Sequence, residues 1–307
     1  MQVRGVSRRV HETVTLATPQ ATLEVVKKFS LRLDKSLGQH FLIDQNILGK
    51  VVDAAVLSKD DVVVEVGPGI GTLTQALAKN AGTVVALELD RKLAPVLDYT
   101  LKSFENAKVV FSDALSVDLK NLPDDLPAPN KLVSNLPYQV ATPILATYLD
   151  KFDDLKLYVV MIQKEVADRI TAKPATAEYG SFSVKAQFYC DVDRVAVVSK
   201  NVFIPPPEVS SAVVRMRRLA QPRVHVFNKE FFFKVVKAAF WQRRKTIKNA
   251  LRGSPELDLD IEEIDRALKK AGIDPKRRGE TLSIEEFAAL TNAFKEVVEP
   301  ASFSKYF

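Results

Sequence analysis

The tetrapeptide Asn135-Leu136-Pro137-Tyr138 begins at the last residue of the apolar run 131–135 and carries groups that suit the binding of a planar amine. The side-chain oxygen of Asn135 and the main-chain oxygen of Leu136 can accept both N–H bonds of one amino group. They would also stabilise positive charge that develops on its nitrogen. Pro137 fixes the backbone that directs the preceding carbonyl, and Tyr138 offers a face on which a base could stack. In the alternative interpretation, Asn135 is a turn residue and Tyr138 is half-buried packing.

A glycine-rich loop lies earlier in the chain, in VVVEVGPGIGTLTQAL (62–77). Gly67, Gly69 and Gly71 have no Cβ atom, so the backbone between them can approach a ligand closely. The dinucleotide fingerprint G-x-G-x-x-G requires glycine at position 72, where this chain has threonine. The spacing G-x-G-x-G with Glu65 in the preceding strand is similar to that of S-adenosylmethionine-dependent methyltransferases. Glycine turns also occur at purely structural strand–helix joints.

Two carboxylates end the next two predicted strands. Glu88 comes seventeen residues after Gly71, where a carboxylate can accept hydrogen bonds from both hydroxyls of a ribose. Asp113 lies where a carboxylate could accept a hydrogen bond from an adenine amino group. Because the carboxyl ends of parallel strands meet at one edge of a sheet, these loops are expected to converge on one ligand site. Alternatively, Glu88 is a solvated acid and Asp113 a helix N-cap.

The elements that position these residues form an alternation of β-branched runs and amphipathic segments that starts near residue 60. This pattern predicts an α/β fold, a parallel sheet covered by helices on both faces. Strands are predicted at 62–66, 83–89, 107–111, 131–135 and 156–162, and three later ones at 183–190, 193–199 and 211–218 are expected to complete the sheet.

Helices are predicted on both sides of this sheet pattern. Residues 21–29 have a helical pattern, and residues 44–57 predict a helix capped by Asp44. Thr142 and Pro143 are expected to be the N-cap and the first residue of a helix inside the sheet pattern.

From about residue 220 the pattern becomes helical. Residues 228–251 predict one long helix, apolar on one side and basic on the other. Trp241 falls on the basic side, and Arg243, on the apolar side, is expected to snorkel or to form a pair. Two further helices are expected behind the N-caps Asp260 and Ser283 and complete a small helical domain.

Positive charge is concentrated in one segment. Val209 to Arg252 contains twelve Lys or Arg and one acid, Glu230, for a net charge of +11, so the remainder of the chain, whose total is +6, has a net charge of −5. Such a concentration of positive charge suits the binding of a polyanion such as RNA. The alternative is a solvated face without a partner.

The composition is ordinary for a globular protein, with 47% hydrophobic and 27% charged residues among 307. The longest apolar runs are too short to span a bilayer, so no membrane contact is expected. The single cysteine, Cys190, rules out an internal disulfide and fits a reducing compartment. His11, His40 and His225 are scattered and lack the spacing of metal ligands. We expect a cytoplasmic monomer without a metal, and the arginine-containing N-terminus leaves organellar targeting open.

Taken together, the motifs resemble the small-subunit ribosomal RNA adenine N6,N6-dimethyltransferases, relatives of the macrolide-resistance RNA methyltransferases. The resemblance implies a Rossmann-like class I methyltransferase with a mostly parallel seven-stranded sheet and a small all-α C-terminal domain. The expected divisions are an N-terminal extension (1–33), the methyltransferase domain (34–218) and a helical RNA-binding domain (219–307). The segments that carry the resemblance include KSLGQHFLID (35–44), NLPYQVATPIL (135–145), QKEVADRI (163–170), VFIPPPEVSSAVVRM (202–216) and FWQRRKTIKNAL (240–251).

The resemblance also implies roles for particular residues. The catalytic set would be the tetrapeptide 135–138 with Phe203, whose ring would form a second stacking face opposite Tyr138; Phe203 could instead be core. At position 40 the family more often has asparagine. S-adenosylmethionine would be held by His40, Leu42, Gly67, Gly69, Gly71, Glu88, Asp113 and Asn135, and RNA phosphates would be contacted by Arg243, Arg244, Lys245, Lys248 and Arg252.

The implied activity is transfer of methyl groups to N6 of two adjacent adenosines of small-subunit rRNA, with a role in small-subunit assembly. The implied partner is the immature small ribosomal subunit. Three alternatives stay open: a large-subunit adenine methyltransferase of the resistance type, a largely non-enzymatic assembly factor with the same fold, and a nicotinamide oxidoreductase. The last of these gives no role to residues 135–138 or to the basic segment.

Overall fold

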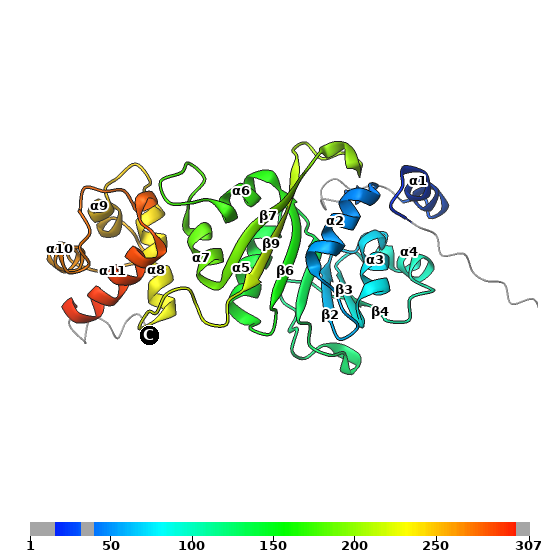
Figure 1. Ribbon diagram of the computed structural model, residues 1–307, viewed down its shortest axis with the longest axis horizontal. Coiled ribbons are helices and arrows are strands. Elements are labelled where there is room, and N and C mark those ends of the chain that lie inside the picture. Colours follow the sequence, from blue (N-terminus) through cyan, green and yellow to red (C-terminus); the bar gives the residue numbers. More distant parts are fainter. Residues whose placement is uncertain (1–15, 32–39, 299–307) are drawn as a thin grey trace, which may run out of the picture. The chain divides into compact units, whose positions relative to one another are not determined.

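The computed structural model describes residues 16–31 and 40–298, and it divides into two compact units (Figure 1). Unit 1 consists of the described residues up to Ile144 with Phe152–Gln163 and Val195–Arg215. Unit 2 consists of Leu145–Lys151, Lys164–Arg194 and the described residues from Met216 onward. The domain boundaries at 34 and 219 stay a prediction, and the targeting question concerns residues outside the described ranges.

A seven-stranded sheet with the order β4-β3-β2-β5-β6-β9-β7 contains the strands that the β-branched runs predict. The first five strands in this order pair in parallel with their neighbours, and β2 lies between β3 and β5. The chain therefore moves one way from β2 to β4 and the other way from β5 to β6, and ligands bind at such a switch point. The strands are β2 (Val62–Val66), β3 (Thr83–Glu88), β4 (Ala107–Phe111), β5 (Lys131–Asn135), β6 (Leu157–Gln163), β7 (Cys190–Val198) and β9 (Ser211–Arg218).

The parallel strands alternate with helices, as the pattern predicts. Asp44 caps its helix, because its carboxylate accepts the Ile47 N–H over 2.9 Å. A further helix begins at Ala141, so Thr142 and Pro143 lie in its first turn and Thr142 is not the N-cap. The helices up to this point are α1 (Pro19–Lys28), α2 (Gln45–Ala55), α3 (Thr72–Asn80), α4 (Ala94–Thr100) and α5 (Ala141–Lys151).

The prediction of a strand at 183–190 is wrong, because Ser181–Tyr189 forms the helix α7, after α6 (Lys164–Thr171). Six of the nine residues of α7 are buried, Ser183 among them. A helix that is covered on most sides shows no amphipathic period. Its apolar and aromatic residues therefore produced the pattern of a strand.

A short two-stranded sheet joins two loops that are far apart in the sequence. Strand β1 (Phe41–Leu42) pairs antiparallel with β8 (Phe203–Ile204), so that Leu42 lies opposite Phe203. This pairing brings residues 40–43 and 202–205 together within unit 1.

The single long helix predicted at 228–251 is two helices, α8 (Lys229–Trp241) and α9 (Ile247–Arg252). Gln242 leaves the helical region at φ −131° and ψ 81°, and Thr246 caps the second helix. The hydrophobic residues predicted on the apolar side are buried in both helices, and the residues predicted on the basic side are not. The turn between α8 and α9 therefore keeps the apolar faces of the two helices on the buried side. The predicted caps Asp260 and Ser283 are confirmed for α10 (Ile261–Lys270) and α11 (Ile284–Val297).

Within residues 16–31 and 40–298, no helix combines the length and the apolar character needed to cross a bilayer. The same residues contain no group of three or more His, Cys, Asp or Glu side chains that could hold a metal ion.

Candidate active site

A cavity of about 430 Å³ lies where β2, β3 and β5 end, a volume in the range of small-molecule sites. Most of the residues predicted to hold a cofactor line it. They are His40, Leu42, Gly67, Gly69, Glu88, Asp113 and Asn135, and Pro137 lines it as well. Gly71 is not part of the lining; it is the N-cap of α3 and packs against α4 and Leu101.

The glycine loop forms one wall because side chains would not fit there. Gly67 and Gly69 have φ values of +70° and +58°, in the left-handed region that favours glycine. A Cβ on Gly67 would lie 3.3 Å from Pro137, and one on Gly69 would lie 3.0 Å from the ring of Phe41. The backbone therefore closes directly on its neighbours, and the Gly67 N–H donates to the main-chain oxygen of Leu87 over 2.9 Å.

The two predicted carboxylates stand at the ends of neighbouring strands. Glu88 is 7% exposed and accepts the Asp90 N–H over 2.9 Å, and burial raises its pKa. Asp113 accepts the N–H of Leu115 over 2.9 Å, so it stabilises its own turn as well as lining the cavity. Both interpretations of Asp113, local cap and ligand residue, are thus compatible with its position.

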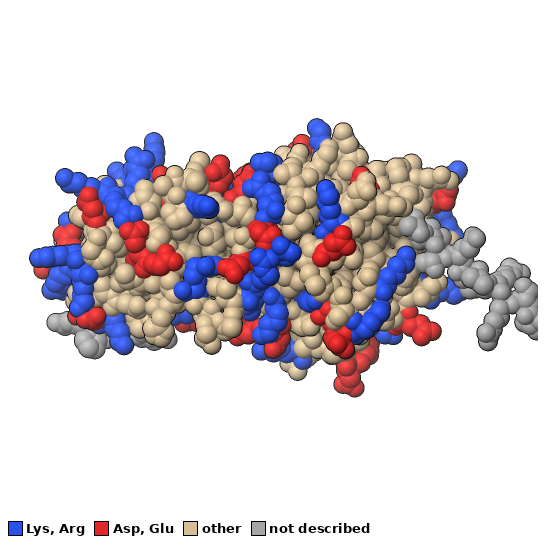
Figure 2. Space-filling view, in the orientation of Figure 1, with Lys and Arg blue, Asp and Glu red and all other residues tan. Residues whose placement is uncertain are grey.

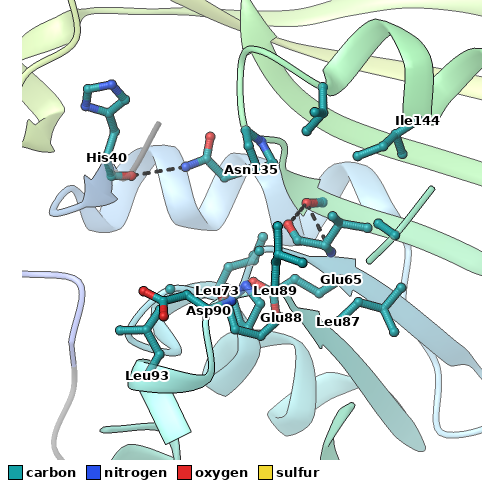
Figure 3. A pocket seen from close by; sticks show the side chains of 18 of the residues that line it. His40, Glu65, Leu73, Leu87, Glu88, Leu89, Asp90, Leu93, Asn135 and Ile144 are labelled. Carbon is teal, nitrogen blue, oxygen red and sulfur yellow. Dashed lines mark hydrogen bonds between the residues drawn. The ribbon is translucent and has the colours of Figure 1, made fainter. Parts of the chain in front are cut away.

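Asn135 is held in one orientation by the chain segment across the cavity (Figure 3). Its side-chain nitrogen donates to the main-chain oxygen of His40 over 3.2 Å, and its side-chain oxygen is buried without a hydrogen-bond partner among the described residues. The ring of His40 is fixed in turn, because Nδ1 donates to the main-chain oxygen of Pro205 over 2.8 Å. Asn135 thus brings a buried acceptor atom without a partner to the lining of the cavity.

The other members of the predicted catalytic set lie beside the cavity. The ring of Tyr138 is partly buried, with its centroid 5.5 Å from that of His40, and its hydroxyl lies 2.6 Å from that of Ser211. Leu136 is 1% exposed, and its N–H donates to the main-chain oxygen of Met161. Phe203 is 2% exposed in the hydrophobic core, so its ring offers no free stacking face here, which agrees with the alternative of core packing.

Glu65 is a further group at this site, to which the sequence analysis assigned no role. It lies in β2, lines the cavity and is 2% exposed, and its Oε2 atom has no hydrogen-bond partner among the described residues. Burial raises the pKa of this carboxyl to about 8, and the nearby negative charge of Glu88 adds to the shift. Its place at the end of a buried strand before the glycine loop is the signal that could have identified it.

The predicted RNA-binding residues belong to unit 2 and differ in their pairing. Arg243 forms a 2.8 Å ion pair with Glu280, which confirms the expected pairing. Lys248 forms a 2.6 Å ion pair with Asp265. Arg244, Lys245 and Arg252 are exposed. In Figure 2, basic side chains project from the part of the molecule that carries α9 and α10, with acidic ones among them.

The sheet order and the cavity at its switch point define a Rossmann-like class I methyltransferase. A family model described as ribosomal RNA adenine dimethylase matches residues 30–296. A relative from Bacillus mycoides (strain KBAB4), named ribosomal RNA small subunit methyltransferase A, is 47% identical over 285 residues, which are 91% of this chain and 97% of the relative. The chain therefore belongs to the ribosomal RNA adenine dimethylase family.

Two solved structures resemble the chain over most of its length. A dimethyladenosine transferase from Plasmodium falciparum has a TM-score of 0.71 at 21% identity and covers 87% of this chain and 98% of its own. The 23S rRNA methyltransferase ErmE has a TM-score of 0.62 at 26% identity and covers 84% of this chain and 100% of its own. The fold prediction, a mostly parallel seven-stranded sheet with a helical C-terminal region, is confirmed.

Proposed function

We propose that this protein transfers methyl groups from S-adenosylmethionine to N6 of two adjacent adenosines of small-subunit rRNA. The product is N6,N6-dimethyladenosine, and this modification has a role in small-subunit assembly. Family membership supports the reaction class. The observation that carries the proposal is the buried side-chain oxygen of Asn135, which has no partner among the described residues and belongs to a residue that lines the cavity of the glycine loop.

The residues of the cavity suit S-adenosylmethionine. Glu88 and Asp113 supply acceptors for ribose hydroxyls and an adenine amino group, and the glycine loop admits a close ligand. Glu65 also lines this cavity, and its Oε2 atom has no partner among the described residues. When bound, the cofactor supplies an electrophilic methyl group on a sulfonium. His40, Leu42, Gly67 and Gly69 complete the set that we propose to hold it.

The acceptor chemistry follows from the electronic structure of adenine. The lone pair on N6 is delocalised into the ring, so the free amine is a weak nucleophile. The side-chain oxygen of Asn135 and the main-chain oxygen of Leu136 accept its two N–H bonds and favour a more tetrahedral nitrogen. They also stabilise the positive charge that forms as the nitrogen gains its methyl group. The nitrogen then loses a proton that has become acidic, so no general base is required.

Tyr138 supports the base in this scheme, and Pro137 directs the carbonyl of Leu136. For Phe203, the role of a second stacking face would require its ring to leave the core, since it is 2% exposed. Its placement opposite Tyr138 therefore stays a prediction. The pairing of β8 with β1 gives Phe203 a defined structural role beside Leu42.

We further propose that RNA phosphates are contacted by the exposed cations of unit 2, Arg244, Lys245 and Arg252, with Arg243 and Lys248 nearby. Such contacts position RNA without reading its sequence. The small-subunit branch is favoured over the large-subunit one because the small-subunit relative is 47% identical and the 23S rRNA enzyme 26%. Cytoplasmic location and a monomeric state stay predictions.

The test is methyl transfer to small ribosomal subunits from cells that lack this gene. Purified protein and S-adenosylmethionine should produce two adjacent N6,N6-dimethyladenosines, detected by nucleoside mass spectrometry and by a primer-extension stop. Large-subunit RNA should remain unmodified. Incorporation into the large subunit alone would instead support the resistance-type alternative, and small-subunit assembly without any methyl transfer would support the non-enzymatic one.

A further inference from the structure

Trp241 is exposed at the end of a helix, in a place where nothing in the proposed methyl transfer uses it. It is the only tryptophan of the chain, it is 55% exposed, and it is the last residue of α8. Tryptophan has the largest apolar side chain, so leaving half of it in water forgoes much of its contribution to folding. A single exposed apolar residue is ordinary, and its surroundings decide whether it has a role.

The turn that follows Trp241 is held rigidly by the segment 277–280. The Ile247 N–H donates to the main-chain oxygen of Arg277 over 2.6 Å. Arg243 reaches both Glu280 and the main-chain oxygen of Ala177 over 2.8 Å. Such contacts fix the backbone on both sides of residues 244 and 245, so the turn presents its outer side chains in a defined arrangement.

A glycine contact fixes the helix end before this turn. Gly279 lies so close to α8 that an added Cβ would be 2.4 Å from the main-chain oxygen of Ala239. No side chain can separate the two segments at this point. Trp241, two residues later, therefore stands at a helix end that packs directly against the backbone at Gly279.

Three of the four exposed residues that follow Trp241 in the chain, at positions 242–245, are cations. Arg244 and Lys245 are exposed, and neither side chain forms a hydrogen bond or ion pair with any described residue. The chain has no acidic residue between Glu230 and Glu256. The nearby Arg243 is neutralised by Glu280, so its contacts serve the shape of the turn, whereas the charges of Arg244 and Lys245 remain open to a ligand.

We propose that Trp241 is a stacking platform for an unpaired RNA base, next to phosphates that bind Arg244 and Lys245. This inference rests on the proposed RNA substrate and adds to it a base-contacting residue outside the active-site cavity. Phosphates satisfy the two cations, but a regular duplex hides the faces of its bases. An unpaired base offers a flat surface to an indole ring, whereas both faces of a base inside a stem are covered by its neighbours, so a loop, bulge or strand end fits this surface better than a stem.

The single tryptophan makes the test direct, because all indole fluorescence of the protein comes from this site. We would titrate the full-length protein with an RNA hairpin that has a single-stranded loop, and with a blunt duplex of the same stem. The loop RNA should quench the fluorescence of Trp241 and protect it from acrylamide. The duplex should bind through phosphates with little effect on either.

Substitutions give a second readout by polarisation of labelled RNA. Trp241→Ala should raise Kd for the loop RNA by about 5- to 150-fold, the range of one stacked base, and leave Kd for the duplex unchanged. Trp241→Phe should lie in between. Val197→Ala is the matched control, since Val197 is also 55% exposed but lies on β7. Because both side chains are exposed, thermal unfolding of the variants should match wild type.

Two results would overturn the proposal: binding of loop RNA without any change in Trp241 fluorescence or accessibility, or equal weakening of loop and duplex by Trp241→Ala. A variant that loses affinity only for intact small subunits, and not for protein-free RNA, would assign the surface to a protein partner. Methyl transfer by the wild-type protein is measured separately. Its absence would refute the proposed function, whereas normal transfer with an unresponsive Trp241 would refute this inference alone.

Discussion

The side-chain nitrogen of Asn135 donates a hydrogen bond to the main-chain oxygen of His40, across 95 residues of sequence. This bond orients the amide, whose oxygen can accept from an amine and has no partner among the described residues, and Asn135 is one of the residues that line the cavity. Orientation before the substrate arrives is what makes electrostatic stabilisation effective, since no reorganisation is then needed during the reaction.

Substitution of Asn135 should separate chemistry from binding. Asn135→Ala removes the acceptor and is expected to lower the turnover number by at least about 100-fold, the usual effect of removing one preorganised polar group. RNA affinity should survive, because the proposed phosphate contacts lie in unit 2. Single-turnover methyl transfer and filter binding measure the two quantities.

Asn135→Asp is the informative companion variant. Aspartate keeps an acceptor oxygen but cannot donate to the main-chain oxygen of His40, so transfer should be reduced yet measurable. Turnover of Asn135→Ala at the wild-type rate would refute the acceptor role. Equal activity of the two variants would show that the acceptor atom is not what matters at this position.

The contribution of Tyr138 to methyl transfer should depend on its ring more than on its hydroxyl. Tyr138→Phe loses the hydrogen bond with Ser211, which is 0% exposed, and should lower the free energy of unfolding by about 1 kcal/mol. Methyl transfer by this variant should be nearly normal. Tyr138→Ala removes the stacking face and should raise KM for RNA several-fold. Loss of transfer in Tyr138→Phe would argue for a role of the hydroxyl instead.

Glu65 should make stability depend on pH in a direction that is unusual for a carboxylate. Its native pKa of about 8 exceeds the ordinary value of 4.5 because the group is buried. Between these values the unfolded state has released a proton that the native state still holds. The free energy of unfolding therefore falls as pH rises, by up to about 1.4 kcal/mol per pH unit from this group.

Glu65→Gln removes this titration while keeping the shape of the side chain. Urea unfolding of both proteins at pH 5, 6.5 and 8 should show the variant gaining stability relative to wild type as pH rises. A difference in unfolding free energy that is the same at all three pH values would contradict the raised pKa.

The cations of the turn after α8 should contribute unequally to RNA binding. Arg244→Ala and Lys245→Ala should each lower the slope of log Kobs against log salt by about 0.7–0.9, the effect of losing one phosphate contact. Arg243→Ala removes the same charge from the same turn, but Arg243 is paired with Glu280. The salt slope of RNA binding by the Arg243→Ala variant should therefore change less, and the unfolding temperature of this variant should fall. Equal slopes for all three variants and wild type would rule out phosphate contacts here.

Most strands could be predicted from the sequence because buried parallel strands are short β-branched runs bounded by turns. The helix α7 could not, since burial on most of its sides removes the amphipathic period. The break between α8 and α9 was also missed. It is maintained by contacts with Arg277, Gly279 and Glu280, about 30 to 40 residues further along the chain, which no local pattern reports.

By itself, the sequence determined which groups would meet at the active-site edge. Strand ends of a parallel sheet converge, so the glycine loop, Glu88, Asp113 and Asn135 had to be neighbours. Only the tertiary structure decided the state of each group. The partner of the Asn135 amide, the burial that raises the pKa of Glu65, and the pairing of Arg243 that leaves Arg244 and Lys245 open all depend on residues distant in sequence. Hydrogen bonding, desolvation and ion pairing act over a few ångströms of space, and chain spacing does not encode those distances.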